Sequence, residues 1–554
     1  MPSSTSTMNA SSEPNKITLQ ELQEHDGIKN PRLWAVLYDH VYDLTDFASV
    51  HPGGEEMIRS ACARDATALF ESYHLSSSII AKSYLNNKKS PSKSIKYVGE
   101  FDVESAKVST NNSSDELPND AAIKFTFQSP LSSIENGQQR NIYEIMKQRI
   151  RDQLMKKPDF KNRIRKVDGL RLVNAIFIIG GLLICQLASQ YIPSLPLVVV
   201  IALGALAGLF HHLTMVHILH DVGHGSFTNN TRFWNWFGTF GSYILGQSFY
   251  CWTIRHNVAH HVYTNMSELD PDVGVYEWNR YLEATNTNAT TKVPAKVKSS
   301  STDRAADEVN VVSKMYEEPK DYKSVPVNIM AKTGSFSSLP LLYASLIFYM
   351  QLVDFVHYWT RHVSEGVTFA SSTLSWTTFH FYLSKIVFVV YRTILPGYLF
   401  YKSGGVIGRS TLEALLAFVA TEVVAGILFG FLSQINHISE KCAWPSNVLN
   451  EMVENSNGNG DLDWAEIQVR TCIDYCHDSY LWTYLSGFLN YQVIHHLFPG
   501  INPWLYPTLL PIVKQVCKEN SVPYTIYDKF SDALESHVRQ LTLFSKKQLL
   551  NNTL

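Results

Sequence analysis

The chain has 554 residues and a formal net charge of -3, which gives no electrostatic reason to expect a nucleic acid as partner. Its mean hydropathy of -0.08 resembles that of a soluble protein, but the average combines two polar ends with a strongly apolar middle. Seven scattered cysteines give no indication of an oxidising compartment, and we interpret Cys472 and Cys476 as a structural pair on one helix face. Residues 1–16 have no apolar core, so no cleavable signal peptide is expected.

Composition divides the chain into four parts. They are a disordered tail, a compact soluble module, a linker with a charged helix, and a membrane domain, at residues 1–15, 16–102, 103–165 and 166–554. The linker proper, 103–137, is rich in Ser, Asn and acidic residues. The stretch 140–166 carries many Lys and Arg, which favours a cytosolic helix facing lipid headgroups.

The soluble module contains two histidines in a pattern that suits a flat cofactor. Residues 34–42 alternate apolar and polar side chains, which predicts a half-buried strand pair. The turn His51-Pro-Gly-Gly54 is rigid, and its glycines allow a close backbone approach. His74 follows 23 residues later and can supply an opposite axial ligand, which leaves a haem iron with no open position and suits it to electron transfer.

This pattern resembles cytochrome b5. The resemblance implies an α+β domain that binds haem b with His51 and His74 as axial ligands. Arg64, before Asp-Ala-Thr, departs from the usual small turn residue; we expect it to alter the local backbone and leave both ligands in place. His25 and His40 lack such a context and are predicted to lie at the surface.

Four apolar stretches of the membrane domain are long enough to span a bilayer as helices: 172–189, 195–216, 381–400 and 412–433. Two others, 338–356 and 233–252, are interrupted by Pro340 or by polar residues, and we predict interfacial helices there. This assignment leaves an even number of crossings between the histidine clusters described next, so all of them reach one side. A polar stretch at 284–323 is predicted to be a disordered cytosolic insertion, in which the acceptor motif at Asn288 stays unmodified.

Seven of the twenty histidines fall in three clusters beside these apolar stretches. They are His220 and His224; His256, His260 and His261; and His495 and His496. Histidines four apart share one face of a helix, whereas adjacent ones diverge by roughly 100° and can feed two neighbouring metals. Imidazole is a common ligand of iron and zinc. Any single pair has a plainer explanation as interfacial hydrogen-bonding residues, but three clusters together indicate a metal site.

An electron carrier joined to a metal site in a membrane indicates redox chemistry on a lipid. An unactivated methylene has no accessible acidity, so iron-activated O2 is the plausible oxidant. Reducing O2 to two waters takes four electrons, of which the C–H bonds supply two and the haem supplies two. Formation of a carbon–carbon double bond therefore balances.

The three clusters look like the histidine boxes of membrane fatty-acyl desaturases. Together with the haem module and the glutamine that opens the third box, they are similar to the front-end desaturases. Supporting residues are Thr264-Asn265, Asp270-Pro-Asp272 and Leu489-Asn-Tyr, and His437 resembles the family's additional histidine. The resemblance implies an all-α membrane domain with two non-haem irons, O2 as co-substrate, and these metal or catalytic residues: His220, His224, His256, His260, His261, His437, Gln492, His495 and His496. It also implies a lipid or acyl-CoA substrate, NADH–cytochrome b5 reductase as electron donor, and the endoplasmic reticulum membrane with the haem and histidines cytosolic.

Other residues receive weaker assignments. His211, His212 and His217 are minor candidates whose only considered site role is support of the ligands, and we expect His357, His362, His380 and His477 to be interfacial. Glu422, in the fourth span, is by default a functional-site candidate that either bonds a ligand imidazole or faces another helix. The aromatic residues Trp234, Trp236, Tyr250 and Trp252 are candidates for the wall of an acyl tunnel.

The position of the new double bond is the finest prediction. Relatives that act at carbon 6 often have an acidic residue just before the last His-His pair, whereas this chain has Val493-Ile494. We therefore favour a delta-5 desaturase acting on twenty-carbon precursors. The alternatives are a delta-6 desaturase, a delta-8 sphingolipid long-chain-base desaturase, a lipid hydroxylase and a non-enzymatic haem electron carrier. Chain length, acyl carrier and oligomeric state are left open by the sequence.

Overall fold

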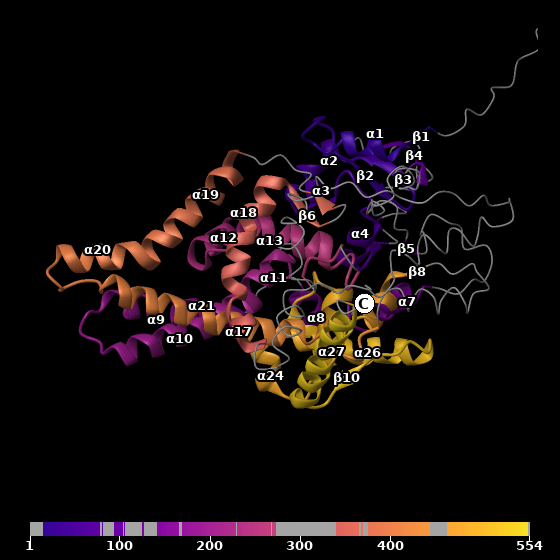
Figure 1. Cartoon of the computed structure of the whole chain (residues 1–554). Coiled ribbons are helices and arrows are strands. Elements are labelled where there is room, and N and C mark those ends of the chain that lie inside the picture. Colours follow the sequence, from indigo (N-terminus) through magenta and orange to yellow (C-terminus); the bar gives the residue numbers. More distant parts are fainter. Residues whose placement is uncertain are drawn as a thin grey trace, which may run out of the picture.

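The computed structural model describes most of the folded parts of the chain (Figure 1), at residues 15–77, 80, 94–103, 105, 125–126, 141–164, 169–228, 230–266, 269–272, 339–364, 367–368, 375–443 and 462–551. The predicted tail, nearly all of the linker, and the insertion at 284–323 with Asn288 lie outside these residues.

The N-terminal module is built on a four-stranded sheet in the order β1 (Lys16–Ile17), β4 (Lys96–Phe101), β3 (His40–Asp43), β2 (Trp34–Leu37). Strands β2 and β3 form an antiparallel hairpin, which confirms the predicted strand pair. Its two turn residues, Tyr38 and Asp39, both have positive φ, as a tight two-residue hairpin requires. The module's helices are α1 (Leu19–Glu24), α2 (Thr45–Ala48), α3 (Glu55–Ala61) and α4 (Thr67–Tyr73). The module is thus α+β, as predicted.

Among the described residues, four helices are long and apolar enough to cross a membrane: Gly169–Tyr191, Leu197–Gly223, Thr377–Lys402 and Thr411–Gln434. They include α9 (Gly169–Tyr191), α10 (Leu197–Thr214), α19 (Ser375–Val389), η5 (Val390–Ile394), α20 (Leu395–Lys402) and α21 (Thr411–Gln434), and they extend to one side of the molecule (Figure 1). Helices α10 and α21 pack closely because small residues face the contact: a Cβ on Gly208 would lie 2.5 Å from the Thr421 carbonyl oxygen. The predicted number of spans is confirmed.

The stretches that we predicted to be interfacial form shorter helices. They are α12 (Thr231–Leu245), α13 (Phe249–Thr253), α17 (Leu339–Ala344) and α18 (Leu346–Thr360). None of them is among the helices that meet the length and hydropathy of a membrane span within the described residues.

One histidine cluster lies on a π-helical turn and another directly follows one, which the sequence did not predict. The segment η2 (Met215–Leu219) leads into α11 (His220–Gly223), and η3 (Ile254–His260) carries the second cluster. Here the His261 N–H donates to the His256 carbonyl, five residues back, at 3.0 Å. The wider turn brings residues five apart in the sequence close together. The α-helical spacing of four residues that we assumed for this cluster was therefore wrong at η3. Such π-turns often occur at functional sites.

The charged stretch after the linker forms α7 (Ile142–Gln153) and α8 (Pro158–Arg163). One face of α7 is fully buried, including Met146 and Lys147, between the N-terminal module and α26 (Tyr506–Glu519). The prediction of a helix that simply faces lipid headgroups was therefore wrong for this face. Ala68 of the N-terminal module belongs to the same hydrophobic core as α7 and the C-terminal region, so the parts share one core.

The C-terminal region consists of short elements that surround the third histidine cluster. They are α23 (Trp464–Arg470), α24 (Tyr480–Leu485), η6 (Leu489–Tyr491), α25 (Gln492–Leu497), η7 (Pro503–Leu505), α26 and α27 (Phe530–Asn551). Three small sheets pair β5 (Phe125–Thr126) with β8 (Leu462–Asp463), β6 (His362–Ser364) with β7 (Val367–Thr368), and β9 (Asp474–Tyr475) with β10 (Ile526–Tyr527). Because β9 lies between Cys472 and Cys476, the predicted shared helix face was wrong; both cysteines are buried thiols.

Candidate metal centre and haem cleft

The two histidines predicted to ligate haem, His51 and His74, face each other. We refer to the space between these two rings as the haem cleft. Their ring centroids lie 6.2 Å apart. Each Nδ1 bonds a nearby backbone carbonyl, His51 to Gly54 at 3.0 Å and His74 to Phe70 at 2.7 Å. Nδ1 therefore carries the proton, and Nε2 has the lone pair that a metal needs. Metal–imidazole bonds of about 2 Å on opposite sides of one ion put the two centroids roughly 6 Å apart, so this pair fits axial ligation of a haem iron.

The backbone around these histidines accommodates the predicted irregularities. A Cβ on Gly53 would lie 2.5 Å from His51 Cε1, so the turn requires the small residue that the motif supplies. Arg64 is buried, and the residue before it, Ala63, has a φ of 63°. The departure at Arg64 thus coincides with a strained turn remote from the ring nitrogens. His25 and His40 are half-buried rather than fully exposed, and His25 stacks on Trp34.

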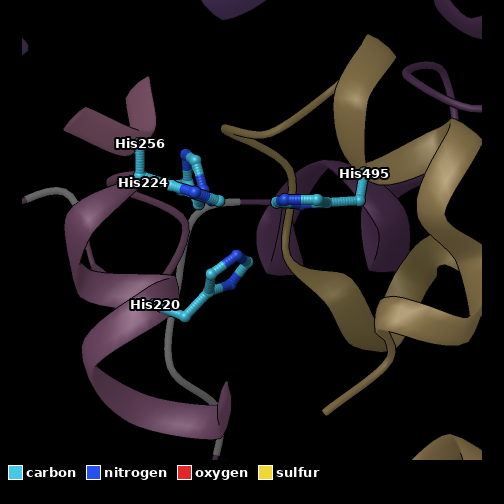
Figure 2. Close-up of side chains that lie close together, drawn as sticks. All are labelled: His220, His224, His256 and His495. Atoms are coloured by element: carbon cyan, nitrogen blue, oxygen red, sulfur yellow. The ribbon is translucent and has the colours of Figure 1, made fainter. Parts of the chain in front are cut away.

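The three histidine clusters come together in the interior. One group consists of His220, His224, His256 and His495, whose rings point toward one another (Figure 2). A second group consists of His260, His437 and His496, and a third, of His261, His495 and His496, links the two. Within each group the potential ligand atoms lie within 4.8 Å of one another. The adjacent residues His495 and His496 thus face different groups, which is the arrangement that two neighbouring metals need.

Most of these imidazoles are oriented by a side chain bound to Nδ1. His256 bonds Asp272 at 2.8 Å and His260 bonds Asp270 at 2.9 Å. His496 bonds the Gln468 carbonyl oxygen at 2.9 Å, and two tyrosine hydroxyls lie on the Nδ1 atoms of the first group: Tyr73 on His224 at 2.8 Å and Tyr506 on His495 at 3.3 Å. Such partners fix the tautomer and direct Nε2 toward a metal.

A bound metal would give a partner to the histidine Nε2 atoms that point into the groups. The Nε2 atoms of His224, His495 and His496 are buried and have no hydrogen-bond partner within the described part of the chain. Buried polar atoms are normally paired, because an unpaired one carries an uncompensated desolvation cost of about 1–3 kcal/mol. The donor set therefore fits metal ions held by neutral imidazoles.

Burial also sets the protonation state of these rings. Loss of solvation, followed by the repulsion of neighbouring imidazoles, holds the pKa of His224, His261, His495 and His496 well below the usual value. Neutral imidazole is the form that ligates metals. His260 differs: burial also opposes its charge, but the carboxylate of Asp270 raises its pKa overall.

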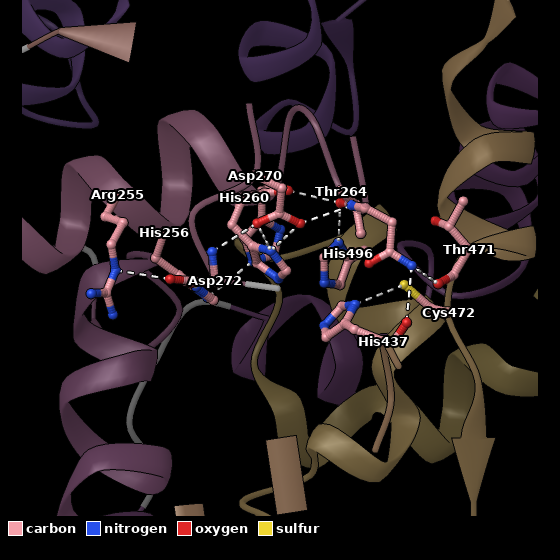
Figure 3. A network of polar contacts seen from close by, with 12 residues as sticks. Arg255, His256, His260, Thr264, Asp270, Asp272, His437, Thr471, Cys472 and His496 are labelled. Atoms are coloured by element: carbon pink, nitrogen blue, oxygen red, sulfur yellow. Dashed lines mark hydrogen bonds and ion pairs between the residues drawn. The ribbon is translucent and has the colours of Figure 1, made fainter. Parts of the chain in front are cut away.

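A loop after the second cluster builds the carboxylate partners (Figure 3). The Asp270 carboxylate accepts hydrogen bonds from the backbone N–H groups of Asn265 at 2.8 Å and Asp272 at 2.9 Å. These bonds fix the carboxylate in its orientation toward His260. Asn265, with a φ of 59°, donates its side-chain amide to the His437 carbonyl at 3.0 Å. Thr264 donates to Gln468, the partner of His496. The residues that supported the resemblance in sequence therefore connect the second cluster to His437 and the third cluster.

Gln492 lies beside His437. Its amide nitrogen lies 2.9 Å from His437 Nε2, and its carbonyl oxygen accepts from Asn436 at 2.9 Å. On the other side of the His437 ring, Nδ1 is 3.6 Å from the Cys472 thiol. The contact of Cys472 with His437 could not be predicted, because nothing in the spacing of Cys472 relates it to a histidine 35 residues away. The ligand roles of all these residues stay predictions.

A cavity reaches the histidines and is lined by His220, His256, His260, His437 and Gln492. Its other lining residues include Arg255 and Asp272 but are mostly apolar, among them Met215, Leu346, Tyr349, Met350 and Phe429. Of the four aromatic residues expected along a tunnel, Trp252 lines this cavity and the others do not. Trp236 is instead 66% exposed, and Trp234 is buried against Gly225.

The remaining histidines and Glu422 lie away from the metal groups. His212 and His217 are buried and bond the backbone carbonyls of Leu485 and Tyr484. Glu422 faces other helices: His211 at 3.6 Å, Arg392 at 3.8 Å and Gln351 at 3.2 Å. Of the four histidines predicted to be interfacial, His357 is buried and His362 is exposed, whereas His380 bonds Tyr243 and His477 stacks on Tyr491, both half-buried.

The fold and site together define a protein with four candidate membrane spans among its described residues, an N-terminal module with a pair of facing histidines, and a buried cluster of histidines that could hold metal. Comparison with known families agrees. The family described as cytochrome b5-like heme/steroid binding domain matches residues 18–101, and the fatty acid desaturase family matches residues 194–292 and 315–528. The second match covers more than half of the chain, so this protein belongs to the fatty acid desaturase family and is an oxidoreductase.

Curated relatives match over almost the whole chain. A "Probable Delta(5) fatty acid desaturase C" of Dictyostelium discoideum is 28% identical and covers 94% of this chain and 93% of its own length. An "Acyl-lipid (8-3)-desaturase" of Mortierella alpina is also 28% identical and covers 95% and 96%. An "Acyl-lipid omega-13 desaturase" of Chlamydomonas reinhardtii is 24% identical and covers 93% and 94%. Similar chains thus carry names for different double-bond positions.

Proposed function

We propose that this protein is an O2-dependent front-end desaturase that uses two non-haem irons and receives electrons through its own haem module. The observation that carries the proposal is the pair of linked histidine groups beside a mostly apolar cavity, with buried Nε2 atoms that have no hydrogen-bond partner among the described residues. A four-coordinate zinc site would use at most four of these ligands. Seven box histidines with His437 are better suited to two metals.

The bound irons would supply the activation of O2 and the removal of hydrogen from the substrate. The protein's own residues have three other tasks. Asp270, Asp272 and Gln468 fix the ligand rings, as described above. The apolar cavity walls hold an extended acyl chain against the histidines and exclude water. The complete reaction converts CH2–CH2, O2, two electrons and two protons into CH=CH and two waters.

We place the protein in the endoplasmic reticulum membrane, with haem and histidines on the cytosolic side. Four spans give the even number of crossings that brings the three clusters to one face. The electron donor to the haem is then a cytosol-facing NADH-dependent flavoprotein, cytochrome b5 reductase. His51 and His74 are half-buried, which suits exchange with an external donor.

For the position of the double bond, we propose delta-5 activity on a twenty-carbon polyunsaturated acyl chain. The support is the similarity to the Dictyostelium relative, which is named as a probable Delta(5) fatty acid desaturase. The residue before the last His-His pair adds less than we expected from the sequence: Val493 and Ile494 are fully buried in the core, and neither is among the residues that line the cavity.

Feeding experiments test this function. Yeast that lacks polyunsaturated lipids would express the protein and receive dihomo-gamma-linolenic acid or linoleic acid separately, with a His495→Ala, His496→Ala double variant as the inactive control. We expect arachidonic acid from the first substrate. A product from linoleic acid alone would establish delta-6 activity, a long-chain-base product would establish a sphingolipid desaturase, and a hydroxylated product would establish a hydroxylase.

A further inference from the structure

Tyr73 lies at the point where the haem module meets the metal centre. It is the last residue of α4, and the next residue is His74, one of the two histidines that face each other in the haem cleft. Its hydroxyl oxygen lies 2.8 Å from Nδ1 of His224, and the two rings are nearly parallel, with centroids 6.3 Å apart. Tyr73 is therefore adjacent in sequence to one histidine of the haem cleft, and its side chain contacts a histidine of the first metal group.

Tyr73 differs from the other Nδ1 partners in its origin. Among the described residues, the side chains on His256, His260, His495 and His496 all come from the membrane and C-terminal domain. The partner of His224 alone comes from the haem module. Because Nε2 of His224 points into the metal group, its Nδ1–H donates to the Tyr73 oxygen.

The contact lies in a fixed interface rather than at a mobile surface. Glu71, on α4, forms a buried ion pair with Lys147 of α7 and also accepts from Ser77 at 2.8 Å. Tyr143 of α7 lies within 3.4 Å of the Glu71 carbonyl and donates to the carbonyl of Leu497, beside the third histidine cluster. Helix α4 is thus held at Glu71, two residues before Tyr73, so the distance to His224 is set by the fold.

We propose that Tyr73 is the positioning residue that couples the haem to the metal centre, so that electrons pass from the haem through His74 and Tyr73 to His224. This inference rests on the proposed function. In each transfer one haem iron is oxidised from ferrous to ferric and the metal centre gains one electron. Two transfers, each followed by re-reduction of the haem by the flavoprotein reductase, supply the two electrons for one double bond. No bond to Tyr73 forms or breaks.

The test compares Tyr73→Phe with the wild-type chain, both loaded with haem and iron. The variant keeps the ring and removes the oxygen that accepts from His224. Stopped-flow absorbance would follow reoxidation of ferrous haem after mixing with O2 and substrate. We expect reoxidation to slow on the order of tenfold, the lower end of the loss when a ligand's outer partner is removed. Haem content, the low-spin haem spectrum and the rate of haem reduction by the reductase stay unchanged.

Two further measurements separate coupling from a general structural effect. Protein reduced fully beforehand, haem and iron alike, has its first pair of electrons already at the metal centre, so Tyr73→Phe and wild type should form equal product in the first turnover. Tyr97→Phe, a substitution on β4 away from this contact, should reoxidise like wild type. A reoxidation rate of Tyr73→Phe within twofold of wild type would overturn the proposal, as would a loss of first-turnover product equal to the loss in rate. Wild-type protein that forms no double bond would instead overturn the proposed function.

Discussion

The haem cleft and the metal centre orient their imidazoles by different means. In the cleft, His51 and His74 bond backbone carbonyls three and four residues away. In the metal centre, the partners are side chains, and some are far away in the chain: Gln468 is 28 residues from His496, and Tyr73 is 151 residues from His224. A local backbone fold is enough to build the first site, whereas the second exists only when the whole chain has folded.

The two sites also differ in exposure, and the difference matches their tasks. The cleft histidines are half-buried, which suits exchange of electrons with a partner. The metal-centre histidines are all buried, and their cavity is apolar. The proposed oxidising reaction needs solvent and side reactions kept out. The interface around Glu71 and Lys147 joins the two sites without exposing the second.

The largest expected effect is at the haem cleft. His51→Ala removes one of the two proposed haem ligands, so we expect complete loss of the low-spin haem spectrum and of nearly all turnover. Absorbance spectra and product analysis of the purified chain would measure both. His40→Ala, in the same module and outside the cleft, is the control and keeps both. Full turnover by a haem-free variant would show that a separate donor suffices.

The interface between the sites should be nearly as sensitive. Lys147→Met leaves the Glu71 carboxylate buried without its cation, and breaking a buried pair from one side costs about 3–5 kcal/mol. We expect a clear drop in the midpoint of thermal unfolding. Lys156→Met, on an exposed pair with Asp152, is the matched control and should change little. Equal midpoints for the two variants would mean that the haem module is not held by this pair.

Removing one carboxylate should weaken the metal centre and spare the cleft. Asp270→Asn takes away the charge that fixes His260 and should lower iron affinity by about 10–100-fold. Iron and haem contents of the same preparation measure the contrast, because haem content should not change. Asp532→Asn, an exposed acid on α27, should alter neither. Parallel loss of haem and iron would contradict the independence of the two sites.

The smallest expected effect concerns α23, the helix that carries Gln468. Asp463 caps this helix, accepting from the backbone of Ala465 and Glu466, and burial raises its pKa to about 7. Between about pH 4 and that value the folded chain holds a proton that the unfolded chain has lost, so stability falls as pH rises. Asp463→Asn keeps the cap without titrating. Its unfolding midpoint relative to wild type should therefore be higher at pH 8 than at pH 5; a constant difference would contradict this.

What the sequence predicted follows the same division between local and distant contacts. The hairpin at 34–42, the His-Pro-Gly-Gly turn and four spans depend on local pattern or on apolar length, and all three could be inferred. The π-turn at η3 could not, because its wider spacing comes from packing around the cavity rather than from a residue pattern. Tyr73, Gln468 and Cys472 could not be found either, since each meets its histidine only in the folded chain.

The burial of α7 shows the same limit. Lys147 contributed to a charged, helix-prone stretch that indicated a membrane-surface position. In the structure its ammonium group is buried against Glu71, which lies 76 residues earlier in the chain. Net charge along a segment does not show which of its charges meet a partner of opposite sign inside the protein.

The metal content of the purified chain tests the central claim most directly. Total iron minus haem iron should give about two non-haem irons per chain, because the histidines form two linked groups. His51→Ala protein, without haem, should retain the same two irons, since the sites are built independently. Preparations from cells grown with excess iron exclude displacement by zinc. Stoichiometric zinc with full desaturase activity, or a single iron per fully active chain, would contradict the account.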